Sequence, residues 1–171
     1  MSHFRYERRS SMEKNIQSFT ESLDHTFRLS DKDWSLYSPL TLAYIGDGAY
    51  DLVVRSLFVK TANCQTQKLH QKVTSCVSAR AQAAMIEALR PCLTDEEAAI
   101  YRRGRNAKPY TKAKNASMQE YLEATGFEAM IGYLYLNGAF DRMNELIAKG
   151  LAAIGVWTQE EKERDEKREK N

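Results

Sequence analysis

Two acids in apolar surroundings are the residues of this sequence with the clearest potential for chemistry. Asp47 lies in SPLTLAYIGDGAYDLVVRSLF, residues 38–58, and Glu128 lies in MQEYLEATGFEAMIGYLYL, residues 118–136. An ionised carboxylate among apolar neighbours is unfavourable unless a partner or a cation compensates its charge. Taken alone, each acid fits a satisfied core acid or a surface acid as well as it fits a metal ligand. Two acids in matching settings favour a shared site.

Both acids fall in segments with helical periodicity. Ser38 and Pro39 mark the start of one helix, which we expect over residues 38–58. A capping box of Ser117 and Glu120 opens the other helix, which we expect to end at residues 137–138, an Asn-Gly pair. Each acid then lies near the middle of a helix of about 20 residues. If the two helices cross, the carboxylates meet near the crossing.

The ligand types indicate which cation such a pair would hold. Two neighbouring carboxylates repel each other, and a shared divalent cation relieves that repulsion. Oxygen ligands without His or Cys favour magnesium or manganese, which bind through one or two carboxylates together with water and substrate phosphate. Metal-assisted hydrolysis of a phosphodiester is therefore the leading hypothesis, provided that the chain also offers a surface for nucleic acid.

The charge distribution predicts such a surface. The net charge is only +2, but residues 53–85 contain no acid, and YRRGRNAKPYTKAK, residues 101–114, carries six bases and no acid. In residues 160–170 every residue is charged, six acidic and five basic, which hides the basic character of the rest. Basic segments usually form solvated helix faces. Two of them without any acid favour contact with a phosphate backbone.

Length and composition predict one all-α domain. With 171 residues and 43% hydrophobic content, the chain can bury one substantial core. We expect residues 1–37 to form a partly ordered arm in which Trp34 and Leu36 pack against the core, residues 38–157 to form the domain, and residues 158–171 to form a charged tail. Helices are expected over residues 66–89 with a break near Ser78, over residues 95–106 after a Thr94–Glu97 capping box, and over residues 139–154.

The sequence gives no sign of a membrane or secreted protein. No apolar run approaches the roughly 18 residues of a membrane span, and the first residues lack a secretory signal. Three widely spaced cysteines indicate reduced thiols rather than disulfides or a zinc site. We therefore expect a cytoplasmic protein with no membrane partner.

Several segments resemble a known family. LAYIGDGAYDLVVR, residues 42–55, resembles the signature helix of ribonuclease III, and FEAMIGYLYLNG, residues 127–138, resembles its second acidic helix. The segments KLHQKV, VSARAQA and RRGRNAK resemble more narrowly the Mini-III subgroup, which comprises a catalytic domain alone. The resemblance extends from about residue 39 to residue 154, with its segments in the same order as in the family.

The resemblance implies a fold, an activity and partners. The fold would be the all-helical bundle of the ribonuclease III endonuclease domain, assembled as a homodimer. The activity would be magnesium-dependent cleavage of double-stranded RNA to 5′-phosphate products, with Asp47 and Glu128 as catalytic and metal-binding residues. In the Mini-III subgroup the substrate is a stem of the large-subunit (23S) ribosomal RNA precursor, so the assembling large ribosomal subunit is a further candidate partner. The RNA-binding residues are expected to be Arg103, Arg105, Asn106, Lys108, Lys112, Lys114, His70 and Lys72.

The sequence also departs from full-length ribonuclease III. Ala43 and Thr125 stand where the longer enzymes carry a glutamate and an aspartate, and residues 155–171 are too few for a double-stranded RNA-binding domain. We therefore expect RNA binding to come from this domain, from its dimer partner, or from a substrate presented on an assembling ribosomal particle. For Asp51 we favour an ion pair with Arg55 at i+4, and an additional outer ligand of the metal is the alternative role. Two alternatives remain: a catalytically silent RNA-binding or ribosome-associated module with this fold, and a helical protein-interaction adaptor.

Overall fold

The computed structural model describes residues 19–61, 63–108 and 116–157. These residues divide into two compact units, one within residues 19–32 and one within residues 33–157. The first unit holds α1 (Phe19–Phe27), a short helix with no buried residue. Its two terminal phenylalanines are each 67% exposed. The predicted division into an arm, a domain and a tail stays a prediction.

Helices form the framework of the second unit. In chain order they are η1 (Trp34–Leu36), α2 (Pro39–Thr61), α3 (Thr66–Val77), α4 (Ala79–Leu89), η2 (Arg90–Cys92), α5 (Asp95–Arg105), α6 (Met118–Leu136) and α7 (Phe140–Ala153). The described residues contain no strand, so the predicted all-α fold is confirmed. No helix in this part of the chain has the length and apolar content that crossing a membrane would require.

Side-chain caps define where three of these helices begin. Ser78 ends α3 in an extended conformation and caps α4 with its hydroxyl, so the predicted break at this residue is confirmed. Thr94 with Glu97 at α5, and Ser117 with Glu120 at α6, form complete capping boxes. Each box satisfies two backbone N–H groups that have no partner within the helix. These short-range signals placed the helix starts correctly.

The region before α2 differs from the prediction. Leu36 is 79% exposed, so the expectation that it packs against the core is wrong. A 3₁₀ turn has three residues per turn, which prevents Trp34 and Leu36 from facing the same side. The Trp34 ring instead contacts the Tyr37 ring, with centroids 4.9 Å apart, and Tyr37 packs against the core. At its other end α2 runs to Thr61, about one turn beyond the predicted residue 58.

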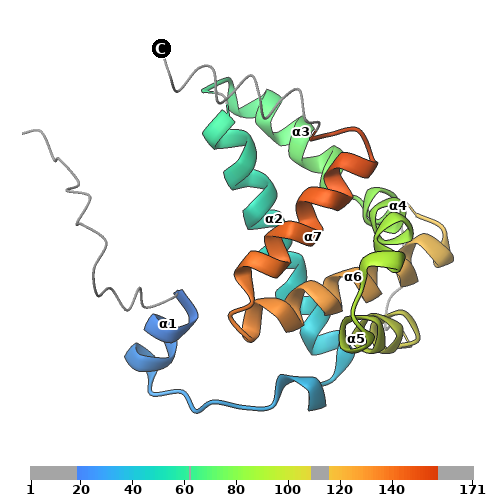
Figure 1. Ribbon diagram of the computed structural model, residues 1–171. Helices are drawn as coiled ribbons and strands as arrows, with labels where there is room; N and C mark the ends of the chain where they lie inside the picture. Colours follow the sequence, from blue (N-terminus) through green and yellow to red (C-terminus); the bar gives the residue numbers. More distant parts are fainter. Residues whose placement is uncertain (1–18, 62, 109–115, 158–171) are drawn as a thin grey trace, which may run out of the picture. The chain divides into compact units, whose positions relative to one another are not determined.

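The longest two helices, α2 and α6, cross each other, and the crossing lies in the N-terminal part of α2 (Figure 1). A Cβ atom on Gly46 would overlap the carbonyl oxygen of Glu128, and one on Gly132 would overlap that of Leu42. Neither backbone could approach the other so closely if either glycine carried a side chain. Gly46 and Gly132 are therefore the residues that permit the close contact between the two helices.

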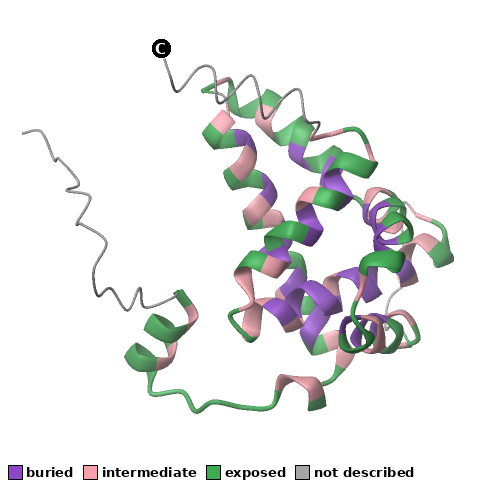
Figure 2. Ribbon diagram, viewed as in Figure 1, coloured by how far each residue is buried: buried purple, intermediate pink, exposed green. Residues whose placement is uncertain are grey.

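The remaining helices cover this crossing and build the core. Helix α4 packs against both α6 and α7, α5 packs against α6, and α3 packs against α2. Figure 2 shows the buried positions along α4, α6 and α7 facing the interior of the unit. Tyr50 joins three elements: its hydroxyl donates to the carbonyl oxygen of Cys76 at 3.1 Å, and its ring meets that of Phe127 edge-on at 5.1 Å. The core therefore fixes α2 and α6 in register.

Candidate active site

The crossing of α2 and α6 brings Asp47 and Glu128 together. Asp47 directly follows Gly46, whose backbone lies against the carbonyl group of Glu128. The two side chains are close enough for the charge of Asp47 to raise the pKa of Glu128. The prediction that two mid-helix acids meet at a helix crossing is confirmed.

Glu128 is the more buried acid of the pair. It is half-buried on a helix whose neighbouring residues are mostly inaccessible. Burial raises its pKa most, the charge of Asp47 raises it further, and a hydrogen bond from Gln82 opposes both, which leaves a pKa of about 8. Near neutral pH and without a cation, most of the Glu128 population therefore holds its proton.

Asp47 lies at the edge of the buried face of α2 rather than within it. It is exposed, whereas Ala43 and Tyr50, one turn to either side, are buried. The predicted apolar surroundings of Asp47 are wrong for its outer side, where Asp51 and the exposed Tyr44 lie one turn away. Partial burial, followed by the charge of Asp51, raises the pKa of Asp47. One carboxylate is thus held inside the protein and the other faces solvent.

A third polar side chain, which the sequence analysis missed, faces Glu128 from α4. Gln82 is 1% exposed, and its amide nitrogen donates to the carbonyl oxygen of Val77 at 3.3 Å as well as hydrogen-bonding Glu128. Its amide oxygen Oε1 has no partner. The sequence could have indicated that Gln82 is buried, because its helical spacing places it on the apolar face of α4 together with Met85 and Leu89.

The donor chemistry at this crossing fits a divalent cation of the magnesium type. Two carboxylates and the unpartnered amide oxygen are all oxygen donors, which magnesium and manganese prefer. Within the described ranges, no three His, Cys, Asp or Glu side chains form a group that could hold a metal. A cation here would therefore be bound by Asp47 and Glu128 and keep several waters, as magnesium commonly does.

Comparison with known proteins identifies the family. A sequence profile of the Ribonuclease III domain matches residues 40–139. A Mini-ribonuclease 3 from Thermoanaerobacter sp. (strain X514) is 39% identical over 143 residues, 84% of this chain and 99% of that protein. One from Enterococcus faecalis is 40% identical over 126 residues, 72% of this chain and 96% of that protein. The chain belongs to the ribonuclease III family. Its resemblance to the Mini-III subgroup is confirmed by the same relatives.

A solved structure supports the family fold. A crystal structure of a protein from Fusobacterium nucleatum superposes with a TM-score of 0.62 at 29% identity, covering 68% of this chain and 93% of that one. Membership in the ribonuclease III family makes the chain an endoribonuclease of the type that acts on double-stranded RNA. The crossing of its two acidic helices is thus the candidate active site of a ribonuclease III domain.

The two positions at which this ribonuclease lacks acids of the longer enzymes are closed to solvent. Ala43 and Thr125 are each 6% exposed. The Thr125 hydroxyl donates back to the carbonyl oxygen of Tyr121 at 2.9 Å. Asp51 pairs with Arg55 one turn along α2, so the predicted ion pair is confirmed. Asp47 and Glu128 remain the acids that can meet at the crossing.

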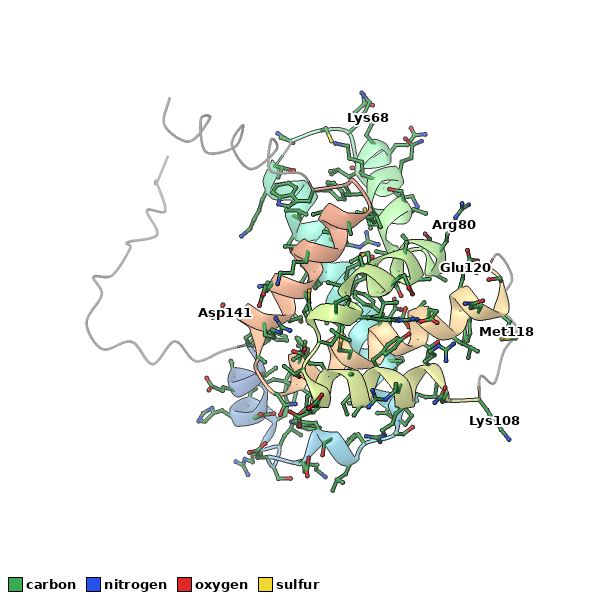
Figure 3. All side chains as sticks on the ribbon, turned by 45° about the vertical axis from the view of Figure 1, so that its right-hand side comes forward. Lys68, Arg80, Lys108, Met118, Glu120 and Asp141 are labelled. Carbon is green, nitrogen blue, oxygen red and sulfur yellow. The ribbon has the colours of Figure 1, made fainter. Side chains whose placement is uncertain are left out.

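The predicted RNA-binding residues of the ribonuclease occupy two separate places. His70 and Lys72 are exposed on α3, whereas Arg103, Arg105, Asn106 and Lys108 lie at the end of α5. Figure 3 shows Lys68 of α3 and Lys108 projecting outward from opposite ends of the unit. Lys112 and Lys114 lie outside the described residues. Those of the predicted residues that the structure describes therefore do not form one patch on a single chain.

Two of these bases already have protein partners. The guanidinium of Arg103 donates to the carbonyl oxygens of Ser35 and Tyr37, the latter at 2.7 Å, and so ties η1 to α5. Arg105 pairs with Glu123 at 2.7 Å. Asn106 and Lys108 are exposed, with Asn106 as the residue that ends α5. The role of all these residues in RNA binding stays a prediction.

An arginine cluster around Glu123 was also missed from sequence. Glu123 is 5% exposed and accepts hydrogen bonds from Tyr101, Arg105 and Arg90. Burial alone would raise its pKa, but these three donors together lower it below the ordinary value. Arg90, Arg102 and Arg105 line a cavity of about 380 Å³ beside this carboxylate. Glu123 pairs with Arg90 and Arg105, and the described lining of the cavity holds three arginines and no acid, so the cavity is basic.

Proposed function

We propose that this chain is a magnesium-dependent endoribonuclease whose metal site is formed by Asp47 and Glu128. The observation that carries the proposal is the meeting of these two carboxylates at the α2–α6 crossing, where the charge of Asp47 adds to burial in raising the pKa of Glu128. A cation would offset the charge that the fold concentrates there. Manganese, which prefers the same oxygen donors, should substitute for magnesium.

The two acids have different tasks because their exposure differs. When bound, the cation would polarise the scissile phosphate and favour loss of a proton from the attacking water. Glu128, half-buried and held by Gln82, fixes the inner side of the site. Asp47, at the exposed edge of α2, faces the direction from which a phosphate must arrive. Hydrolysis would leave a 5′ phosphate on one product.

A homodimer is part of this proposal. On its solvent side α2 carries a stripe of exposed apolar residues at helical spacing, with Tyr44 84%, Leu52 63% and Val59 61% exposed. Gly48, between Tyr44 and Leu52, has no atom within 4 Å of the place where its Cβ would stand. An apolar stripe of this kind suits a self-complementary contact between two copies. Two copies would supply one active site for each strand of a duplex.

The substrate that we propose is a stem of the large-subunit ribosomal RNA precursor, bound either free or on the assembling subunit. Its support is the Mini-III resemblance together with the bases on α3 and α5. A cytoplasmic location belongs to the same proposal, with Cys64, Cys76 and Cys92 as free thiols. The RNA duplex would be recognised mainly through its phosphates and 2′-hydroxyls, since side chains cannot read the narrow A-form major groove.

The direct test is cleavage of long double-stranded RNA, with and without magnesium, by wild type, Asp47→Asn and Glu128→Gln. Both substitutions keep the side-chain shape and remove the anionic ligand, so cleavage should be lost while RNA binding is retained. Asp141→Asn, which changes an exposed acid on α7, serves as the control and should cleave normally. Full magnesium-dependent cleavage by either active-site variant would remove that residue from the metal site. A wild type that binds RNA without cutting it would instead identify a silent RNA-binding module.

A further inference from the structure

Gln82 is an unusual residue in the core of this ribonuclease. It is buried on α4, and its Oε1 is the only buried side-chain nitrogen or oxygen atom without a hydrogen-bond partner in the described part of the chain. A buried acceptor that lacks a donor destabilises a protein. An apolar residue would fill the same position without that loss. The glutamine therefore needs an explanation beyond packing.

The orientation of the amide is fixed by its neighbours. Nε2 donates to the carbonyl oxygen of Val77 at 3.3 Å, and the side chain also hydrogen-bonds the carboxylate of Glu128, an interaction that lowers the pKa of that acid. Rotating the amide by half a turn would place an oxygen against both of these acceptors. Oε1 consequently has no hydrogen-bond partner, and it belongs to the same planar amide group that hydrogen-bonds Glu128.

No group in the described part of the chain supplies the missing donor. A hydrated divalent cation bound by Asp47 and Glu128 brings such donors, because magnesium retains several of its waters when few protein ligands are present. Outer residues that orient a ligand while contacting the cation's hydration shell are common in metal sites. Gln82 has the two functions that such a residue needs: a donor for the ligand and a free acceptor.

We propose that Gln82 is a positioning residue of the metal site, in which Nε2 orients the Glu128 carboxylate and Oε1 accepts a hydrogen bond from a water of the bound cation. The inference rests on the proposed function, because it needs a cation at Asp47 and Glu128. Under this proposal α4 contributes a residue to the active site in addition to the two acidic helices, α2 and α6.

The test measures cation binding without RNA, so that it does not depend on turnover. Mn²⁺ binding is followed by the electron paramagnetic resonance signal of the free ion, and thermal melts are recorded with and without Mg²⁺. Gln82→Met keeps the approximate volume and removes both hydrogen-bonding functions, and it should weaken Mn²⁺ binding by about 10- to 100-fold. The matched control Gln119→Met changes an exposed glutamine of α6 and should bind like wild type.

A second variant keeps the inference testable if Gln82→Met fails to fold. Gln82→Glu places a third carboxylate at the crossing, so the metal-free protein should melt at a lower temperature than wild type. Mg²⁺ should then raise its melting temperature by more than it raises that of wild type, because the added oxygen faces the cation. The two variants thus shift cation binding in opposite directions, which a purely structural role for Gln82 would not produce.

The outcomes separate the inference from the proposed function. If folded Gln82→Met binds Mn²⁺ like wild type, or if Gln82→Glu gains no extra stabilisation from Mg²⁺, Gln82 has no part in the site. In that case loss of Mn²⁺ binding by Asp47→Asn still supports the proposed metal site. If wild type and Asp47→Asn bind Mn²⁺ equally weakly, the proposed metal site fails and the role of Gln82 fails with it.

Discussion

Gly46 and Gly132 lie backbone to backbone where α2 crosses α6. A Cβ on Gly46 would stand 2.7 Å from the backbone nitrogen of Gly132, and a Cβ on Gly132 would stand 3.0 Å from that of Gly46. The contact is therefore reciprocal, and it lies one residue from Asp47 and four from Glu128. The same glycines that let the helices approach each other set the distance between the two acids.

Replacement of Gly132 by Ala should destabilise the fold strongly. The new methyl group would meet the backbone of α2, which cannot rotate away as a side chain can. We expect a loss of about 3 kcal/mol in the free energy of unfolding, even though alanine favours helix by about 1 kcal/mol over glycine. Urea unfolding monitored by circular dichroism measures this difference.

Gly150→Ala is the matched control for that variant. Gly150 is also a buried helical glycine, but its added methyl group would meet the flexible side chain of Met85 instead of a backbone. Methionine can adopt another rotamer, so the loss should stay below about 1 kcal/mol. Equal losses in the two variants would show that the crossing is not the tightest contact of the core.

The pH dependence of stability should reveal Glu128 in the metal-free protein. Its pKa rises from 4.5 to about 8 on folding, so between these values the folded state holds a proton that the unfolded state has released. The stabilisation from this proton is fully present below the unfolded pKa and is lost as the pH rises through the folded pKa. Glu128 therefore makes the melting temperature fall between about pH 5 and pH 9.

Glu128→Gln should remove that contribution because it cannot titrate. Its melting temperature should decline less with pH than that of wild type, and at high pH it should be the more stable protein. Asp141→Asn should follow the wild-type curve. Thermal melts in a chelator across this pH range provide the measurement, and parallel curves for wild type and Glu128→Gln would contradict the raised pKa.

Much of the fold was predictable because its signals are local. The caps at Ser78, Thr94 and Ser117 mark helix starts within four residues of sequence, and the all-round apolar character of α6 follows from its buried position. The meeting of Asp47 with Glu128 could also be predicted, since both are mid-helix acids. Leu36 could not be placed correctly, because the direction of a side chain in a three-residue turn depends on the neighbouring contacts.

The remaining site residues depend on contacts between distant segments. Gln82 looked like one polar residue in a helix, and only the packing of α4 on α6 shows that it faces Glu128. Arg103 and Arg105 looked like equivalent bases in a basic run. Their partners, the η1 carbonyl groups and Glu123, come from other elements and cannot be inferred from spacing.

The apolar stripe on α2 should control the oligomeric state. Leu52→Arg places a charge at the centre of the stripe, where Leu52 is 63% exposed in the single chain. The substitution should leave the stability of the monomer almost unchanged and dissociate the dimer, because a buried unpaired charge opposes association. Sedimentation equilibrium at micromolar concentration measures the change.

Leu36→Arg is the control for the dimer prediction, since Leu36 is an exposed leucine outside the stripe, at 79% against 63% for Leu52. It should sediment like wild type. A wild type that is monomeric and still cuts both strands of a duplex would rule out the dimer. Dissociation by Leu36→Arg rather than by Leu52→Arg would place the contact on η1.

Arg103 and Lys108, at the end of α5, should differ in their roles, since Arg103 contacts the protein and Lys108 is exposed. Alanine variants of the two residues test this difference. Arg103→Ala loses hydrogen bonds to two backbone carbonyl groups and should lower the free energy of unfolding by about 1–2 kcal/mol. Lys108→Ala removes an exposed side chain and should change stability by less than about 0.5 kcal/mol.

The effect of Lys108→Ala should appear instead in RNA affinity. The salt slope should fall by about 0.9 log units if one phosphate contact is lost, using the coefficient of B-form DNA. Duplex binding is measured in the Asp47→Asn background at several salt concentrations, so that cleavage does not interfere. If Arg103→Ala keeps full stability and flattens the salt slope, its guanidinium contacts phosphate rather than η1, and if Lys108→Ala binds like wild type, the bases on α3 must carry more of the RNA.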